Sequence, residues 1–361
     1  MGPSPRPGIL DISPYVGGSH AVEGVERAIV LSANEGALGP SPKALAAFRR
    51  AAARVPRYPE GGAPALRQAI ARHHGVDPAQ IVCGNGSDEL IGLLVQAYAA
   101  PGDEVLFSQH GFLMYRLAAM AYGATPVAAP ETDLKADVDA LLDHVSGRTR
   151  LVFLANPNNP TGSFLPVDEV ERLRRQLTEQ VLLVIDAAYA EYVVRNDYTS
   201  GAELVEAAGN VVMTRTFSKI YGLAGLRLGW AYCPLEVADA LHRVRTPFNV
   251  SVAAEAAGRA ALDDTRHTDA GRSHNEVWRP WLADRLAALG LTVYPSIANF
   301  VLVRFPPEPG RDAEAANGAL ERRGIIARRM GAYGLADCLR ISIGLEPEVR
   351  AVVDALTEFV G

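Results

Sequence analysis

The residues best suited to covalent chemistry lie in one stretch, Thr216-Phe-Ser-Lys219-Ile-Tyr-Gly-Leu-Ala-Gly-Leu-Arg227. Lys219 follows an apolar, strand-like run and is flanked by small hydroxyl residues and glycines. A lysine forms a Schiff base only as a neutral amine, so its pKa must fall from about 10.4 through desolvation or nearby positive charge. Thr216, Ser218 and Arg227 offer two hydroxyls and a forked cation, which suit a phosphate. Alone, this stretch also fits a surface lysine after a strand.

An apolar run that ends in a carboxylate forms the second candidate, Val181-Leu-Leu-Val-Ile-Asp186-Ala-Ala-Tyr189. An acid at the end of a buried strand can pair with a protonated pyridine nitrogen and keep such a ring electron-withdrawing. The same Asp186 could equally cap a helix that follows the strand. The local sequence leaves both interpretations open.

Two further loops follow apolar runs. In Asn156-Pro-Asn-Asn159-Pro-Thr-Gly162, two prolines and a glycine predict a rigid turn that could aim Asn159 at a phenolic oxygen of a cofactor. In Gly84-Asn-Gly-Ser87-Asp88-Glu, glycines precede a helix start, where backbone N–H groups and the helix dipole bind anions. A plain loop and a capped helix start are the alternatives. Neither loop has the GxGxxG or P-loop pattern.

Alternating short apolar runs and amphipathic stretches should position these groups. The expected strands are 81–83, 104–108, 125–129, 149–155, 181–186, 211–216 and 228–232, and helical stretches such as 88–99 and 167–179 separate them. This alternation predicts an α/β fold with a mainly parallel sheet covered by helices on both faces. Such sheets bind ligands at the carboxyl ends of their strands.

The pattern changes after about residue 247. Helical segments dominate 251–289, strands are expected at 299–305 and 338–343, and helices at 312–323 and 347–359. This predicts a smaller α+β domain. We therefore expect three parts: an N-terminal arm at 1–30, a large domain at 31–247 and a small C-terminal domain at 248–361.

Composition narrows the class of protein. The 361 residues carry a net charge of −6 without a long basic stripe, which argues against nucleic acid or an anionic membrane as partner. Cys83, Cys233 and Cys338 lie far apart, which argues against a disulfide framework or a metal site and fits the cytoplasm. The proline-rich start lacks the apolar core of a signal peptide, and no apolar run is long enough to span a bilayer.

Taken together and in order, the motifs GSDE, NPNNPTG, DxxY and TFSKxxGLAGLRLG resemble the fold-type-I pyridoxal-phosphate (PLP) aminotransferases, in the histidinol-phosphate aminotransferase branch. Further matches are Pro14-Tyr15, Ser32-Ala-Asn34-Glu35, Arg57-Tyr58-Pro59, Ala298-Asn-Phe300 and Leu339-Arg340-Ile-Ser-Ile-Gly344. The resemblance covers nearly the whole chain. It implies that the large domain binds PLP.

The resemblance assigns roles to these residues. Lys219 is implied to carry the cofactor and to move the proton, and Asp186 to pair with the pyridine nitrogen. Asn159 and Tyr189 are implied at the phenolic oxygen. The residues implied around the cofactor phosphate are Ser87, Asp88, Thr216, Ser218 and Arg227.

The resemblance also implies a homodimer with shared sites, because Tyr58 is expected to reach the phosphate of the neighbouring subunit's cofactor. Arg340 should bind the substrate carboxylate, and Tyr15 should close over the substrate. Arg328 or Arg329, which precede the Arg340 strand, could bind a far anion of the substrate, or both could be rim charges. Two departures stand out: Phe112 takes the place of a ring-stacking tyrosine, and Asn34-Glu35-Gly36-Ala37 replaces the usual Asn-Glu-Asn-Pro.

The implied activity is ping-pong transamination between an amino acid and a 2-oxo acid, with histidinol phosphate as the favoured donor and glutamate/2-oxoglutarate as the second pair. An aromatic (phenylalanine/tyrosine or cyclohexadienyl) aminotransferase is the main alternative, and a PLP decarboxylase of phosphorylated amino acids is a third. An aminotransferase-like regulator domain is disfavoured, because an arm of about thirty residues is short for a DNA-binding domain.

Overall fold

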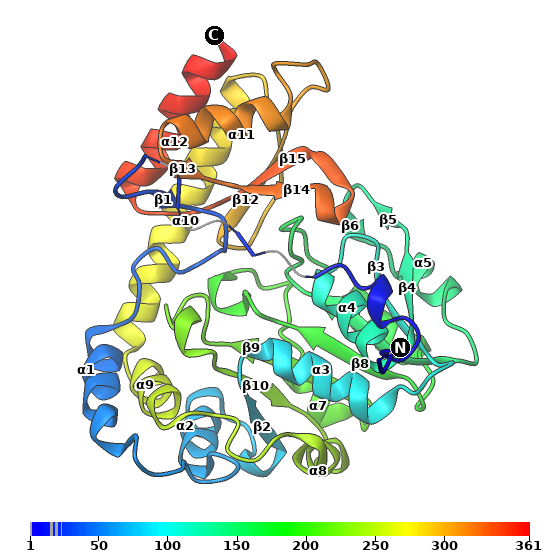
Figure 1. Cartoon of the computed structure of the whole chain (residues 1–361). Helices are drawn as coiled ribbons and strands as arrows, with labels where there is room; N and C mark the ends of the chain where they lie inside the picture. Colours follow the sequence, from blue (N-terminus) through cyan, green and yellow to red (C-terminus); the bar gives the residue numbers. More distant parts are fainter. Residues whose placement is uncertain (1, 15–16, 19–20, 23) are drawn as a thin grey trace.

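A computed structural model describes residues 2–14, 17–18, 21–22 and 24–361 (Figure 1). Its centre is a seven-stranded sheet with the order β2-β10-β9-β8-β7-β3-β4. The strands are β2 (Ile81–Gly84), β3 (Glu104–Ser108), β4 (Thr125–Ala129), β7 (Thr149–Ala155), β8 (Leu182–Asp186), β9 (Val211–Thr216) and β10 (Gly229–Tyr232). Only β10 pairs antiparallel, with both β2 and β9. The predicted mainly parallel sheet is confirmed.

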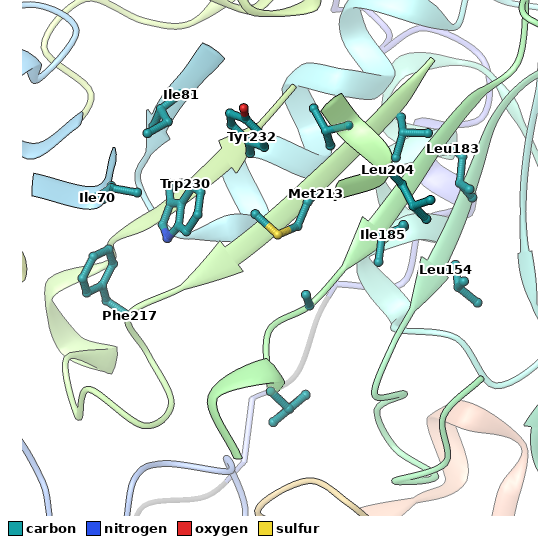
Figure 2. Packing of buried hydrophobic residues seen from close by; sticks show 14 of the residues in the cluster. Ile70, Ile81, Leu154, Leu183, Ile185, Leu204, Met213, Phe217, Trp230 and Tyr232 are labelled. Atoms are coloured by element: carbon teal, nitrogen blue, oxygen red, sulfur yellow. The ribbon is translucent and has the colours of Figure 1, made fainter. Parts of the chain in front are cut away.

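Alternation along the strands supplies two apolar faces. In β3, Val105 and Phe107 enter one buried cluster, whereas Leu106 enters the other. The first face is covered by α3 (Ser87–Tyr98), α4 (Leu113–Tyr122) and α8 (Leu235–Val244). The second is covered by α2 (Pro64–His74), α5 (Val138–Asp143), α6 (Val167–Gln176), α7 (Ala202–Ala207) and α9 (Val252–Leu262). Figure 2 shows part of the second cluster, with Met213 of β9 between Trp230 and Tyr232 of β10 and Ile185 and Leu183 of β8.

The small domain is an antiparallel sheet of order β11-β12-β15-β14 packed on helices. Its strands are β11 (Thr292–Tyr294), β12 (Phe300–Arg304), β14 (Arg328–Met330) and β15 (Leu335–Ser342), and its helices are α10 (Thr265–Ala288), α11 (Ala313–Arg322) and α12 (Glu346–Val360). Leucines and valines from both layers form a separate core.

Shorter elements complete the described chain. A two-residue strand β1 (Ile29–Val30) pairs parallel with β13 (Ile325–Ile326), so the expected arm joins the small domain before the chain enters the large one. The hairpin β5 (Glu131–Thr132)/β6 (Lys135–Ala136), the helix α1 (Pro42–Ala51) and the 3-10 turns Ile9–Asp11, Ala52–Arg54, Pro78–Gln80, Ala190–Tyr192, Ala224–Leu226 and Gly331–Tyr333 fill the connections. No helix in the described ranges is long and apolar enough to cross a membrane.

The helix α9 follows the expected domain boundary at 247/248, but it packs against the large domain. Ala254, Ala257 and Ala261 belong to the same buried cluster as Leu66 and Ile70 of α2. Because α9 shares the core of the large sheet, packing favours a boundary at the start of α10. The division into 1–30, 31–247 and 248–361 otherwise stays a prediction.

Candidate active site

The residues singled out by the motifs line one cavity of about 240 Å³. Its floor is formed by Ala155, Asp186 and Thr216, the last residues of the adjacent strands β7, β8 and β9. The cavity therefore lies at the carboxyl ends of the parallel strands, as the α/β pattern predicts. The expected site residues in its lining are Ser87, Asp88, Phe112, Asn159, Asp186, Tyr189, Thr216, Ser218, Lys219, Arg227, Arg328 and Arg340.

Lys219 stands three residues beyond the end of β9, and its side chain is partly buried. Its Nζ donates to the backbone oxygen of Ala33 at 2.9 Å. Burial, followed by the positive charge of Arg340, lowers the pKa of Lys219 from 10.5 to about 8. A substantial fraction of this amine is therefore neutral near neutral pH, which is the form that attacks a carbonyl carbon.

Asp186 is a buried carboxylate at the end of β8. Its Oδ2 accepts a hydrogen bond from the Tyr115 hydroxyl at 2.8 Å, and its Oδ1 accepts one from Thr214 at 3.3 Å. Burial raises the pKa of Asp186 from 3.8 to about 6. Across the part of the chain that the structure describes, no salt bridge involves this carboxylate. A buried acid of this kind suits a cationic ligand group, and the short helix that follows, Ala190–Tyr192, has Tyr189 rather than Asp186 at its N-cap position.

A cationic cup lies at the other end of the cavity. The Arg227 guanidinium binds Asp88 Oδ2 at 2.9 Å and Ser218 Oγ at 3.3 Å, which fixes its direction. It also lies against Gly86, where a Cβ would come within 2.5 Å of Nη2, so a larger residue there would displace the guanidinium. Ser87 opens α3, and no side chain caps that helix start. Backbone N–H groups, a hydroxyl and a guanidinium together suit a phosphate.

Tyr189 and Asn34 meet on the side of the cavity nearest the small domain. Asn34 Nδ2 donates to the Tyr189 hydroxyl oxygen at 2.9 Å, and Asn34 itself is held by Ser342. Burial raises the pKa of Tyr189, so its hydroxyl keeps its proton. Because this oxygen accepts from Asn34, its own proton can be donated to a different acceptor.

Two arginines from the small domain face the cavity. Arg328 in β14 and Arg340 in β15 are cross-strand partners, so both side chains lie on the same face of the sheet. Arg340 donates to Asn159 Oδ1 and to the backbone oxygen of Ser32 at 2.7 Å, and its guanidinium lies 5.3 Å from the ring centre of Phe300. The cavity thus has a second cationic end, opposite the Arg227 cup.

Two expected site residues do not lie in this cavity. Tyr58 is 83% exposed and stacks on Phe248 with ring centres 4.8 Å apart. Within one chain it reaches no site, and its expected role across a subunit boundary stays a prediction. Tyr15 lies outside the described residues.

The sequence interpretation overlooked several site residues. Asn34, Ser32 and Tyr333 line the cavity, and Tyr115 contacts Asp186 from behind it. Asn34 lies in a motif already noticed, but its position depends on the pairing of β1 with the distant β13. Tyr115 lies three residues after Phe112, one helical turn along, which is the only sequence signal that could have indicated it.

The donor set has a definite chemical character. A buried acid, a lysine with a lowered pKa, a phosphate cup and a protonated tyrosine surround one small cavity. These groups fit a flat nitrogen heterocycle that carries a phosphate, a phenolic oxygen and an aldehyde.

Comparisons with known proteins agree with this geometry. The family model of aminotransferase class I and II matches residues 26–356. The histidinol-phosphate aminotransferases of Paramagnetospirillum magneticum and Rhodospirillum centenum are 62% and 61% identical to the chain, each covering 99% of both sequences.

Solved structures give the same picture. The histidinol-phosphate aminotransferase of Sinorhizobium meliloti, determined in complex with pyridoxal-5'-phosphate, superposes with a TM-score of 0.89 at 34% identity over 98% of this chain and 96% of that one. An aspartate aminotransferase variant of Thermus thermophilus superposes with a TM-score of 0.81 at 25% identity over 92% and 91%.

Proposed function

The chain belongs to the class I and II aminotransferases and, within them, to the histidinol-phosphate aminotransferase family, and we propose that it transfers the amino group of histidinol phosphate to 2-oxoglutarate with the help of PLP. The observation that carries this proposal is a cavity with two cationic ends, one at Arg227 and one at Arg328 and Arg340. One end suits the phosphate of the cofactor, and the other suits the anionic group of a substrate.

The site residues support a definite arrangement of the cofactor. Arg227, Ser218 and the start of α3 would hold its phosphate, and Asp186 would hold its ring nitrogen. Tyr189 would donate to the phenolic oxygen, together with the amide NH₂ of Asn159, whose Oδ1 already accepts from Arg340. When bound, PLP supplies an aldehyde that takes up the amino group and a ring that withdraws electrons from the reacting carbon.

Lys219 moves the proton in this proposal. Its Nζ would remove the proton from the substrate carbon that bears nitrogen and deliver it to the aldehyde-derived carbon of the cofactor, and in the second half-reaction it would carry a proton in the opposite direction. The neutral amine is required for the first step, and the lowered pKa of about 8 makes it accessible near neutral pH. An ionised Asp186 would hold the ring nitrogen of the cofactor in its protonated form and so keep the ring electron-withdrawing.

Arg340 must serve two anions in turn. Histidinol phosphate offers a phosphate and no carboxylate, whereas 2-oxoglutarate offers carboxylates only. A guanidinium fork binds either group, because both present two oxygens at similar spacing. Arg328, its cross-strand neighbour, adds the second positive charge that a phosphate requires.

A donor panel tests the substrate. Histidinol phosphate, histidinol, phenylalanine and tyrosine are each supplied with 2-oxoglutarate, and kcat/KM is measured. The proposal expects histidinol phosphate to exceed histidinol and the aromatic donors by at least tenfold, since one charge-assisted contact contributes about 1.5–3 kcal/mol. If phenylalanine proves to be the best donor, the proposed substrate is wrong and the enzyme is an aromatic amino acid aminotransferase.

We propose that the active unit is a homodimer. Tyr58 and its stacking partner Phe248 are exposed, as are Phe48 and Val55 in the preceding segment. A two-fold contact would cover these groups and bring Tyr58 to the other subunit's phosphate cup. Mixing Tyr58→Phe with Lys219→Ala subunits should then yield hybrids in which one site carries both lesions and the other neither. A fully active monomer in sedimentation would contradict the assembly.

We propose the cytoplasm as its location. Cys83, Cys233 and Cys338 are free and buried, which supports a compartment that keeps thiols reduced. Localisation of a tagged chain by fractionation tests this.

A further inference from the structure

Tyr115 is a buried residue of the first turn of α4 that does not line the cavity itself but contacts two residues that do, Asp186 and Phe112. Its hydroxyl donates to Asp186 Oδ2 at 2.8 Å, while the cross-strand neighbour Thr214 reaches the other oxygen at 3.3 Å. Tyr115 therefore provides the shorter of these two hydrogen bonds to the carboxylate.

The ring of Tyr115 is fixed on two sides. It stacks on Phe153 with ring centres 4.5 Å apart and an interplanar angle of 8°. Its edge also meets Phe112, at 5.9 Å and 88°. Phe112 lines the cavity and lies three residues earlier, so one helical turn connects it with the residue that holds Asp186. The hydroxyl oxygen therefore cannot move away from Asp186 without a shift of the ring against both neighbours.

The contact has a fixed polarity. Burial, together with the nearby Asp186 charge, raises the pKa of Tyr115 well above its ordinary value, so the hydroxyl stays a donor. Burial, and to a smaller extent the negative charge of Asp88, raises the pKa of Asp186. The hydrogen bond from Tyr115 opposes that rise most strongly, ahead of those from Thr214 and the backbone of Ala188. Phenylalanine would fill the same apolar space, but it would leave Asp186 Oδ2 without this donor.

We propose that Tyr115 is a positioning residue that orients Asp186 toward the ring nitrogen of the cofactor and keeps it ionised, and that it ties this carboxylate to the ring-facing Phe112. The inference rests on the proposed function in that it takes PLP as the cofactor, but it does not depend on which amino donor is used. Tyr115 does not touch the reacting atoms and acts through Asp186.

The test compares Tyr115→Phe with Tyr122→Phe. Tyr122 ends the same helix, and its hydroxyl donates to Gln96 at 3.5 Å and does not contact Asp186, so it controls for loss of a hydroxyl from α4. The first measurement is the pH titration of the Asp186 carboxyl in cofactor-free protein. The titration is monitored by the ¹³C NMR signal of the carboxyl, which is assigned by its absence in Asp186→Asn. Tyr115→Phe should move the midpoint up by about one to two pH units, and Tyr122→Phe should leave it in place.

Two readouts follow with the cofactor present. The ¹⁵N shift of ring-labelled PLP should move toward the unprotonated form in Tyr115→Phe, and kcat should fall about tenfold to a hundredfold with KM unchanged. If the proposed amino donor is incorrect, the measured kinetics change for every variant, but the titration of the Asp186 carboxyl does not. The failure of the proposed function is thus distinguishable from the failure of this inference.

An unmoved titration midpoint in a folded Tyr115→Phe protein would overturn the proposal and leave Tyr115 a packing residue. If that variant does not fold, 3,5-difluorotyrosine at position 115 keeps the ring and makes the hydroxyl a stronger donor. The Asp186 midpoint should then move down, and an unchanged midpoint would equally overturn the proposal.

Discussion

The pH at which the cofactor-free protein takes up PLP should report the pKa of Lys219. Only the neutral amine attacks the aldehyde, so the rate of covalent attachment should rise with pH around a midpoint near 8, the value to which burial and Arg340 lower this pKa. A lysine in water titrates at about 10.4 and would show its midpoint more than two units higher.

The size of the effect follows from this shift. With a pKa of about 8, roughly a tenth of the amine is neutral at pH 7, whereas a pKa of 10.5 leaves about 0.03% neutral. Attachment at pH 7 should therefore be about 300-fold faster than for an exposed lysine. Replacing Arg340 by Gln removes a nearby positive charge and should move the midpoint upward.

The assay is stopped-flow absorbance of cofactor uptake between pH 6 and 10, with borohydride trapping and peptide mapping to identify the modified lysine. Lys219→Ala supplies the blank, because it retains the phosphate cup but lacks the amine. A midpoint above 10, or the same pH profile in the blank, would refute the argument that burial activates this lysine.

Four further outcomes are expected. Lys219→Ala should still bind PLP weakly through the phosphate cup, but its transamination rate should fall by several powers of ten. Without cofactor, denaturant titration at pH 7 should show this variant to be more stable than wild type by up to about 3 kcal/mol, reduced by the packing energy that the shorter side chain loses. The folded-state pKa of this lysine is lowered to about 8, so wild type loses stability as pH falls from 10.5 to 8. Asp186→Asn should slow single-turnover amino transfer, and equal rates for variant and wild type would leave the carboxylate without a catalytic role. The same variant should stabilise the cofactor-free protein at pH 7. The reason is that the folded-state pKa of Asp186 is raised to about 6, so wild type loses stability as pH rises from 3.8 to 6. Arg340→Lys should lower the rates of both half-reactions. Arg328→Ala should reduce kcat/KM about tenfold to a hundredfold for histidinol phosphate and less for phenylalanine. Unaltered histidinol-phosphate turnover in Arg328→Ala would show that Arg328 does not bind this substrate. Gly36→Ala should lower Tm and cofactor affinity together, because its Cβ would lie 2.5 Å from the backbone oxygen of Lys219, and an unchanged affinity would show that the loop gives way.

The sequence predicted the large sheet well, because its strands are continuous apolar runs. The expected strand 104–108 coincides with β3, and 181–186 differs from β8 by one residue. The two-residue strands β1 and β13 escaped notice, because their pairing spans most of the chain and leaves no local pattern. The place of α9 relative to the expected boundary at 247/248 stays a prediction, since its alanines do not reveal from the sequence which core they enter.

In the candidate site, too, the residues placed by local sequence could be predicted, whereas those placed by contacts between distant segments could not. Asp186, Lys219 and Asn159 could be named because each lies at the end of a buried strand or within four residues beyond it, and parallel strands bring their ends together. Asn34 and Tyr115 could not be ranked from sequence, because one is placed by a long-range strand pair and the other by the phase of a helix. The role of Tyr58 depends on a second chain and stays a prediction.

The pairing of β1 with β13 sets an order of events for a chain emerging from the ribosome. Ile29 and Val30 are synthesised early, but their partners Ile325 and Ile326 follow only after most of the protein has been made. At about 5–20 residues per second, the early strand waits roughly 15–60 s. The helices and strands of the large domain can assemble during this interval. A nascent chain released before residue 325 lacks both Arg328 and Arg340, and also the strand that places Asn34 beside Tyr189.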